Sequence, residues 1–359
     1  MAVIRTGLKP ARSYYTSCLL SALGYMRFLR LKVLLLSGIF LVAIPIVTVF
    51  WWAERPLQWD KGPIEFTLAP GHSLRQITQD IADAGVPVEP WLLGPLARLE
   101  GRAAHLQAGT YAVTSGITPA ELLTKIERGE VLQIELVVPE GWTFRQLQAA
   151  ITQDVDLKQT VRGWSDAQLL QALGADEASP EGLFAPDTYR FAHGTTDLEL
   201  YRRAYRVQQK RLSDAWASRK PDLPLSSSHE ALVLASIVEK ETGRAEDRPL
   251  VAAVFLNRLR RGMLLQTDPT VIYGLGATFD GTLRKRDLMA DTPYNTYLRA
   301  GLPPTPISLP GSAALSAVVN PSASDALYFV ARGDGTSQFS GSIDEHNKAV
   351  SKYQKGGHP

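Results

Sequence analysis

One apolar segment constrains this chain more than any other feature. Residues 33–53, VLLLSGIFLVAIPIVTVFWWA, contain no charged side chain. A helix needs about 20 apolar residues to cross a hydrocarbon core roughly 30 Å thick, so this segment is long enough. Pro45 is tolerated in a membrane helix, and Trp51 and Trp52 are typical of the membrane–water interface. The sequence therefore predicts a single transmembrane helix over residues 33–53.

The residues before this segment predict its orientation. They include no acidic side chain and six basic ones: Arg5, Lys9, Arg12, Arg27, Arg30 and Lys32. Because positive flanks stay in the cytoplasm, residues 1–32 are predicted to be a cytoplasmic N-terminus and the remainder to face outward. A cleaved signal peptide is the alternative. It is disfavoured because the apolar run is long for such a peptide and WWAERP follows, without a small-residue cleavage pattern.

Charge and cysteine content narrow the class of the outward-facing part. The chain has 38 Lys plus Arg and 36 Asp plus Glu, and six of the basic residues precede residue 33. The part beyond the apolar segment therefore carries an acidic excess, which gives no electrostatic footprint for nucleic acid. The sole cysteine, Cys18, precedes the segment, so the outward part has no disulfide and relies on its core.

A weak internal repeat follows the apolar segment. FTLAPGHSLRQI at residues 66–77 and LVVPEGWTFRQL at residues 136–147 each predict a strand, a glycine turn, a Ser or Thr N-cap and a helix start. VTSGITPAELL, from residue 113, is a weaker third copy. Such units favour a small α+β module, which we place at residues 60–138. A larger mixed, helix-rich domain is expected over residues 139–355, which makes the fold class α+β.

The segment LASIVEKET, residues 234–242, places an acidic side chain on an apolar helix face. At 3.6 residues per turn, Glu241 follows Val238, Ile237 and Leu234 on one face. Glu239 is turned from Glu241 by roughly 200° about the helix axis. The two carboxylates are therefore not expected to share one site.

The position of Glu241 in this helix predicts a raised pKa. Gly243 is expected to end the helix, which leaves Glu241 in the last turn beside unpaired carbonyls and the negative end of the helix dipole. Contact with aliphatic side chains also removes water from the carboxyl group. Both effects favour the protonated acid, the form that a general acid needs near neutral pH. The alternative is a solvated surface carboxylate, the commoner use of a glutamate at a helix end.

Several further motifs follow in order. A second helix can begin at Pro249 and end at Gly262. The chain then continues through LQTDPTVIYGLG, TPYNTYLRAGLPPTPISLPG, LYFVARGDG and EHNKAV. With ASIVEKET, FLNRL, and the earlier EGLFAPDTYRF and AGTYAV, these motifs resemble the endolytic murein lytic transglycosylases, the MltG or YceG-like family. The resemblance covers roughly residues 60–355.

The resemblance implies a reaction and a role for Glu241. The bond cleaved would be the β-1,4 bond between N-acetylmuramic acid and N-acetylglucosamine within a peptidoglycan strand. Glu241 would protonate the glycosidic oxygen and then accept the proton of the muramic O6 hydroxyl as that oxygen closes onto C1. The product would carry a 1,6-anhydromuramyl end, and no cofactor or metal is implied.

The resemblance also implies a cellular setting. The protein would be anchored in the bacterial inner membrane with its catalytic domain in the periplasm. It would act on nascent glycan strands and end their elongation, with peptidoglycan synthases as expected partners. The module at residues 60–138 resembles a LysM-like glycan-binding domain.

Polar and aromatic residues in these motifs are candidates for substrate contact. They are Glu239, Gln266, Thr267, Asp268, Tyr273, Tyr294, Asn295, Thr296 and Tyr297. Hydroxyls, amides and ring faces are the groups that a sugar-binding groove uses, although tyrosines of this kind serve as often in packing. The resemblance makes Glu239 a supporting or structural residue. His346 has no second histidine nearby, so no metal or acid–base role is predicted for it.

Two alternative functions remain open. A hydrolytic muramidase would use Asp268 as a second carboxylate beside Glu241. However, Asp268 directly precedes Pro269 and is therefore expected to be a helix N-cap. A non-catalytic wall-binding scaffold would keep the same fold and lack the chemistry.

Overall fold

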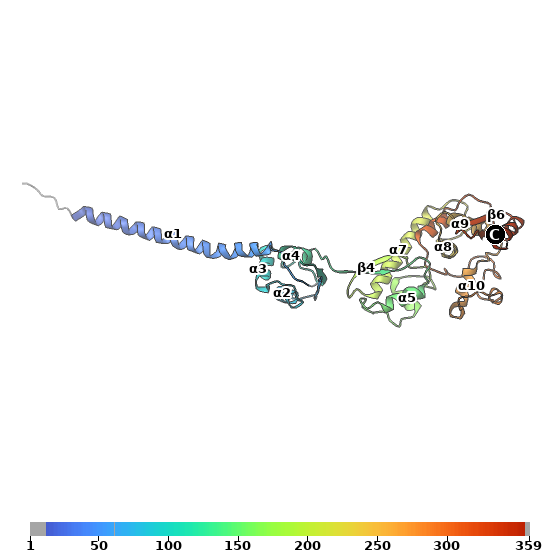
Figure 1. The fold of residues 1–359 in the computed structure, drawn as a ribbon, viewed down its shortest axis with the longest axis horizontal. Coiled ribbons are helices and arrows are strands. Elements are labelled where there is room, and N and C mark those ends of the chain that lie inside the picture. Colours follow the sequence, from blue (N-terminus) through green and yellow to red (C-terminus); the bar gives the residue numbers. More distant parts are fainter. Residues whose placement is uncertain (1–11, 61, 356–359) are drawn as a thin grey trace, which may run out of the picture. The chain divides into compact units, whose positions relative to one another are not determined.

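The chain divides into two compact units, Met1–Leu132 and Gln133–Pro359 (Figure 1). The structure is a computed structural model and describes residues 12–60 and 62–355. The start of the predicted cytoplasmic segment, residues 1–11 with Arg5 and Lys9, lies outside the described residues.

The first unit begins with the long helix α1 (Arg12–Ala53). Its part Lys32–Ala53 is long and apolar enough to cross a membrane, by length and composition. Side chains along this part, such as Leu34 and Leu41, are exposed. The helix is thus longer than the predicted span of residues 33–53, because it continues without a break toward the N-terminus.

A small α+β fold follows α1 within the same unit. Strand β1 (Ile64–Leu68) pairs antiparallel with β2 (Gly109–Val113), and α2 (Leu74–Asp83) and α3 (Pro90–Leu99) connect them. Helix α4 (Pro119–Glu127) completes the unit. Phe66 of β1 stacks on Tyr111 of β2 with ring centroids 5.6 Å apart, at the centre of an aliphatic core.

The predicted repeat is present in the structure. Ser73, Thr118 and Thr143 are the N-caps of α2, α4 and α5 (Phe144–Gln153), and each forms a capping box with the third helical residue. The predicted module, residues 60–138, includes the next strand. Strand β3 (Gln133–Val137) pairs antiparallel with β4 (Thr188–Ala192), so hydrogen bonding assigns it to the second unit.

The second unit is mainly helical. Beyond β3, α5 and β4 it contains α6 (Asp166–Leu173), α7 (Asp197–Ala217), α8 (Ser228–Glu241), α9 (Arg248–Arg260), α10 (Asp268–Leu275), a 3-10 turn (Gly276–Thr278), α11 (Lys285–Leu288) and α12 (Ser312–Val319). The predicted helix at residues 249–262 corresponds to α9. The unit ends with the hairpin β5 (Tyr328–Ala331) and β6 (Ser337–Ser340), α13 (Ile343–Val350) and a π-helical turn, η2 (Ser351–Lys355).

Helix α8 is the centre of the second unit. It contacts α7, α9, α10 and α12, and residues 231–238 are all buried. A helix that is apolar on all sides is one that its neighbours surround completely. The sequence pattern instead predicted a single apolar face, with Glu239 turned away from it. The prediction that only one face of the helix is buried is wrong, because neighbouring helices cover both faces of α8.

Candidate active site

Glu241 is the last residue of α8, where the helix emerges from the core. The N–H of Thr242 caps the helix by donating to the carbonyl of Val238 at 3.4 Å. Glu241 itself is half-buried, unlike the eight buried residues at 231–238. The helix therefore holds this carboxyl rigidly at the edge of the core, as the periodicity predicted.

The Glu241 carboxylate accepts a hydrogen bond from the hydroxyl of Thr267. Thr267 is 2% exposed, and its backbone N–H donates to Thr296 Oγ1 at 3.1 Å. The N–H of Gln266 donates to the carbonyl of Thr296 at 3.1 Å. Gln266 adopts φ of 50°, a left-handed conformation that is uncommon for residues other than glycine. The loop that brings Thr267 to Glu241 is thus held by two backbone hydrogen bonds to Thr296.

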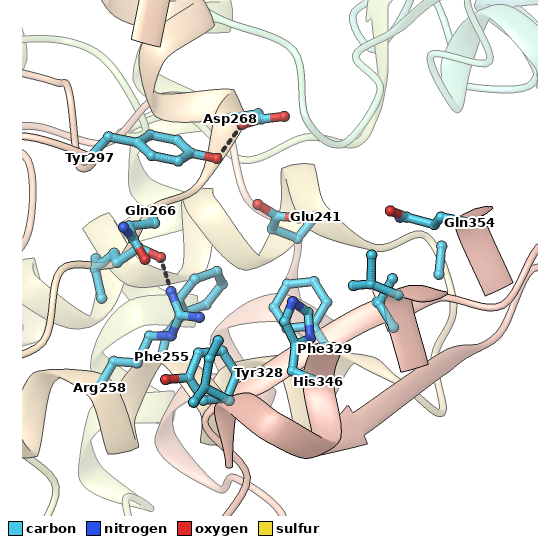
Figure 2. A pocket seen from close by; sticks show the side chains of 15 residues that line it. Glu241, Phe255, Arg258, Gln266, Asp268, Tyr297, Tyr328, Phe329, His346 and Gln354 are labelled. Atoms are coloured by element: carbon cyan, nitrogen blue, oxygen red, sulfur yellow. Dashed lines mark hydrogen bonds between the residues drawn. The ribbon is translucent and has the colours of Figure 1, made fainter. Parts of the chain in front are cut away.

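Glu241 lies in a cavity of about 640 Å³ that is open to solvent (Figure 2). Loop residues, α9 and the C-terminal hairpin and helix form its walls. The lining residues are Glu241, Phe255, Arg258, Leu265, Gln266, Asp268, Tyr297, Tyr328, Phe329, Val330, Ala331, Ile343, His346, Val350 and Gln354. The lining combines apolar and aromatic side chains with charged and hydrogen-bonding groups, so it offers both ring faces and polar contacts to a ligand.

The surroundings of Glu241 raise its pKa. Burial is the largest cause, and the nearby negative charge of Asp268 acts in the same direction. The Thr267 hydrogen bond and the positive charge of Arg258 act against them. The net direction is upward, with burial as the main cause, so the protonated acid is favoured relative to an exposed carboxyl.

Arg258 braces the cavity from α9. It is 8% exposed, and its guanidinium donates to the carbonyls of Leu265 and Leu327, each at 2.7 Å. It also lies 5.1 Å from the ring centroid of Tyr328. Arg258 thereby ties α9 to the Gln266 loop and to the C-terminal hairpin, and it places a positive charge near Glu241.

Asp268 and Tyr297 form the polar rim of the cavity. The hydroxyl of Tyr297 donates to Asp268 Oδ1 at 2.5 Å (Figure 2). Asp268 was expected to be the N-cap of a helix, and this is wrong by one residue. It is the first residue of α10, and Thr267 holds the N-cap position. The Asp268 side chain is therefore exposed toward the cavity and does not cap the helix.

Glu239 does not line this cavity. Its side chain is 5% exposed, accepts the N–H of Gly311 at 2.9 Å and lies 3.7 Å from Arg248. Burial raises its pKa, although the Gly311 hydrogen bond and Arg248 oppose the rise. Glu239 thus joins α8 to α9 and to the start of α12. Glu239 and Glu241 therefore lie in separate sites, as predicted. Glu239 was also a candidate for substrate contact, but its contacts in the structure are with Gly311 and Arg248 inside the protein.

Four other candidate residues also make internal contacts. Asn295 and Thr296 are 0% and 2% exposed, so they brace the loop and present no surface to a ligand. The Tyr273 ring lies 4.8 Å from that of Tyr294, edge to face. The Tyr273 hydroxyl donates to Glu181 at 3.0 Å, and the Tyr294 hydroxyl shares a hydrogen bond with Thr305 at 2.8 Å. Of the predicted residues, Glu241, Gln266, Asp268 and Tyr297 line the cavity.

Several cavity residues were not among the sequence candidates. Arg258 belongs to the FLNRL motif, and its burial as a charged residue marks it only once the fold is known. Tyr328, Phe329 and His346 come from the C-terminal hairpin and α13. Their part in the cavity depends on the packing of that hairpin against α9, with Phe255 and Phe329 edge to face at 6.0 Å. No local pattern in the sequence signals such a contact.

Comparison with known proteins places this chain in a family. A sequence model of the YceG-like family matches residues 66–352. A Bacillus subtilis protein named endolytic murein transglycosylase is 33% identical over 268 residues, which cover 70% of this chain and 74% of that protein. A Streptococcus pneumoniae protein of the same name is 27% identical over 316 residues, 79% of this chain and 57% of that protein.

A solved structure agrees with this placement. The crystal structure of a YceG-like protein from Listeria monocytogenes is 29% identical in sequence, with a TM-score of 0.51. The match covers 80% of this chain and 99% of that one. The sequence model, whose matched range includes Glu241, the relatives and the solved fold agree, and the chain therefore belongs to the YceG-like family.

Proposed function

We propose that this protein is a membrane-anchored endolytic lytic transglycosylase that cleaves peptidoglycan strands between N-acetylmuramic acid and N-acetylglucosamine. The observation that carries the proposal is the position of Glu241, a carboxyl with a raised pKa held by Thr267 in a cavity of about 640 Å³. The names of the relatives from Bacillus subtilis and Streptococcus pneumoniae support the substrate class.

The proposed reaction uses one carboxyl twice. Protonated Glu241 gives its proton to the glycosidic oxygen as the bond from C1 to that oxygen breaks. The resulting carboxylate takes the proton of the muramic O6 hydroxyl while O6 forms its bond to C1. One proton is thereby moved from O6 to the leaving oxygen, and no water is consumed.

The surroundings of Glu241 fit both halves of this cycle. Burial and the charge of Asp268 favour the protonated acid before the bond breaks. The Thr267 hydroxyl and the Arg258 charge favour the carboxylate that forms next. Burial is the largest of these influences, so the pKa is raised overall, and the Thr267 hydroxyl and Arg258 support the carboxylate that forms after proton transfer.

A hydrolytic muramidase is the second candidate, and one observation favours it. The exposed carboxylate of Asp268 lines the same cavity as Glu241 and is held by Tyr297. A second carboxylate could activate water or attack C1. The experiment that separates the two candidates is the analysis of products formed in ¹⁸O-labelled water from uncrosslinked strands, because only hydrolysis introduces oxygen from water.

We also propose that Lys32–Ala53 anchors the chain in the inner membrane, with the second unit in the periplasm next to peptidoglycan synthases. The support is the length and apolar character of this part of α1 and the basic residues before it. A reporter that is active only outside the cytoplasm should work when fused after residue 60 and fail when fused before residue 30. The reverse pattern would refute the orientation, and a mature N-terminus near residue 54 would refute the anchor.

The small α+β fold of the first unit is proposed to bind glycan as a LysM-like module. The support is a surface groove of about 560 Å³ between α2 and α3, where Trp91 is 69% exposed beside Arg75 and Arg98. Exposed aromatic rings stack on sugars, so Trp91→Ala should weaken retention on isolated sacculi roughly tenfold, and Trp91→Phe should restore most of it. Equal retention of the wild type and both variants would mean that Trp91 does not bind glycan and that the module serves as a spacer.

A further inference from the structure

His346 is a cavity residue that the proposed reaction does not use. It lies on α13, and the same side of α13 and η2 contributes Ile343, Val350 and Gln354 to the cavity lining. Figure 2 shows its ring on the floor of the cavity that contains Glu241. His346 is one of several polar groups in this lining, together with Arg258 and Gln354, and the proposed reaction leaves it without a role.

Packing fixes the imidazole ring. It stacks on Tyr328 with ring centroids 5.2 Å apart and an interplanar angle of 25°. The Tyr328 ring is in turn 5.1 Å from the Arg258 guanidinium. Arg258, Tyr328 and His346 thus form a continuous set of contacts along the cavity floor, and the orientation of the imidazole does not depend on a hydrogen bond.

Neither ring nitrogen of His346 has a hydrogen-bond partner within residues 12–60 and 62–355. Nδ1 is fully buried and unpaired. Because the residue lines the cavity, the remaining nitrogen, Nε2, is the one that can face it. A proton on Nδ1 would bury an unpaired donor, so the favoured tautomer carries its proton on Nε2 and presents a donor to the cavity.

The imidazole is neutral in these surroundings. Burial lowers its pKa, and the positive charge of Arg258 lowers it further. The residues that the structure describes contain no group of three or more side chains able to hold a metal ion. Glu241 is the carboxyl beside the reacting bond in the proposed reaction. The role left for His346 is that of a neutral hydrogen-bonding group.

We propose that His346 binds the glycan substrate, with Nε2–H donating to a hydroxyl or acetamido oxygen of a sugar in the Glu241 cavity. This inference rests on the proposed function and names a specific contact within it. It gives the unpaired Nε2 a partner, since a preformed donor on a packed ring binds a neutral sugar without losing conformational freedom. Nδ1 stays buried and unpaired in both states, and the bound state gains the hydrogen bond at Nε2.

The test compares three substitutions by their kinetics on uncrosslinked glycan strands of defined length. His346→Phe keeps a ring to stack on Tyr328 and removes both nitrogens. We expect KM to rise roughly tenfold with kcat changed less than about threefold, because a contact made equally before and during the reaction affects binding alone. His346→Gln can place an amide N–H near the position of Nε2, so it should recover most of the affinity. His346→Asn reaches only as far as Nδ1 and should not.

The thermal stability of the variants separates substrate binding by His346 from a purely structural role. Phenylalanine removes the buried unpaired Nδ1, so the melting temperature of His346→Phe should be equal to or above that of the wild type. Asn347→Ala, on the exposed side of α13, is the matched control and should leave KM unchanged. An unchanged KM in His346→Phe would overturn the inference, as would a loss of kcat alone. Destabilisation of His346→Phe together with failure of His346→Gln would mean a structural role, which also overturns it.

The outcome is separable from that of the proposed function. If the wild type releases no 1,6-anhydro ends, the proposed reaction fails whatever the His346 variants do. If the wild type releases them and His346→Phe behaves as the wild type, only the inference about His346 fails.

Discussion

Replacing Glu241 with glutamine is expected to abolish glycan cleavage and to leave the fold intact. The substitution keeps the size of the side chain and an oxygen that can accept the Thr267 hydrogen bond, and it removes the proton that must be transferred. Loss of one general acid costs about 10²- to 10⁴-fold in rate. The loss should exceed that range here because the same group serves both proton transfers. The measurement is the release of cleaved ends from uncrosslinked strands.

The stability of this variant should also differ from that of the wild type in a defined direction. The pKa of Glu241 is raised in the folded protein. The carboxyl therefore stabilises the folded state at pH values below the usual carboxyl pKa, and this stabilisation is lost as pH rises through the pKa of the folded state. Glu241→Gln should therefore be at least as stable as the wild type at neutral pH. A melting temperature well below that of the wild type would mean that the loss of activity reflects misfolding.

Glu239→Gln is the matched control on the same helix, and it should retain activity. Glu239 is 5% exposed and lies 3.7 Å from Arg248, so the substitution leaves a buried arginine without its counter-charge. The raised pKa of Glu239 shows that burial of its charge opposes this loss at neutral pH, so the net change in stability should be small. Activity should remain near that of the wild type at temperatures where the variant is folded. If the folded Glu239 variant loses activity, the assignment of the proton transfer to Glu241 alone would be wrong.

Glu181 is expected to make the stability of the second unit decrease as pH rises. Burial raises its pKa from the usual 4.5 to about 7, although Phe144 N–H and the Tyr273 hydroxyl both donate to it. A carboxyl with a raised folded pKa contributes stability that is present below 4.5 and is lost as pH rises through about 7. The difference in pKa corresponds to roughly 3 kcal/mol at most.

Glu181→Gln should remove the part of the decline in stability between pH 5 and pH 8 that Glu181 causes. Glu241 and Glu239 shift in the same direction, so the difference between wild type and variant isolates the contribution of Glu181. Amide hydrogen exchange in the buried part of α8, residues 231–238, reports the opening of this unit. Equal pH dependence in the two proteins would show that Glu181 is ionised in the folded state at pH 5.

Glu241 could be proposed as the general acid from the sequence because the relevant pattern is local. Glu241, Val238, Ile237 and Leu234 lie on one face of a single helix, and the end of that helix is marked by Gly243. Helix caps were predictable for the same reason, as Ser73 and Thr143 show. The burial of Glu239 was not predictable, since it depends on the N–H of Gly311, far along the chain.

The remainder of the cavity could not be deduced from residue types alone. Asn295 and Thr296 carry groups that suit a sugar, yet the same groups satisfy backbone atoms inside the loop, and only burial distinguishes the two uses. Strand β3 overlaps the start of the second copy of the repeat, yet it pairs with β4, which is distant in sequence, and no local pattern signals this pairing. His346 reaches the cavity through the packing of the final hairpin and helix.

The central claim is that the O6 hydroxyl of the substrate, and not water, attacks C1 while Glu241 transfers the proton. Mass spectrometry of products from uncrosslinked strands cleaved in ¹⁸O-labelled water tests it directly. The wild type is expected to give 1,6-anhydromuramic ends without ¹⁸O, and Glu241→Gln is expected to give no product. Reducing ends that carry ¹⁸O would contradict this expectation and would identify water as the nucleophile, with Asp268 as the second carboxylate.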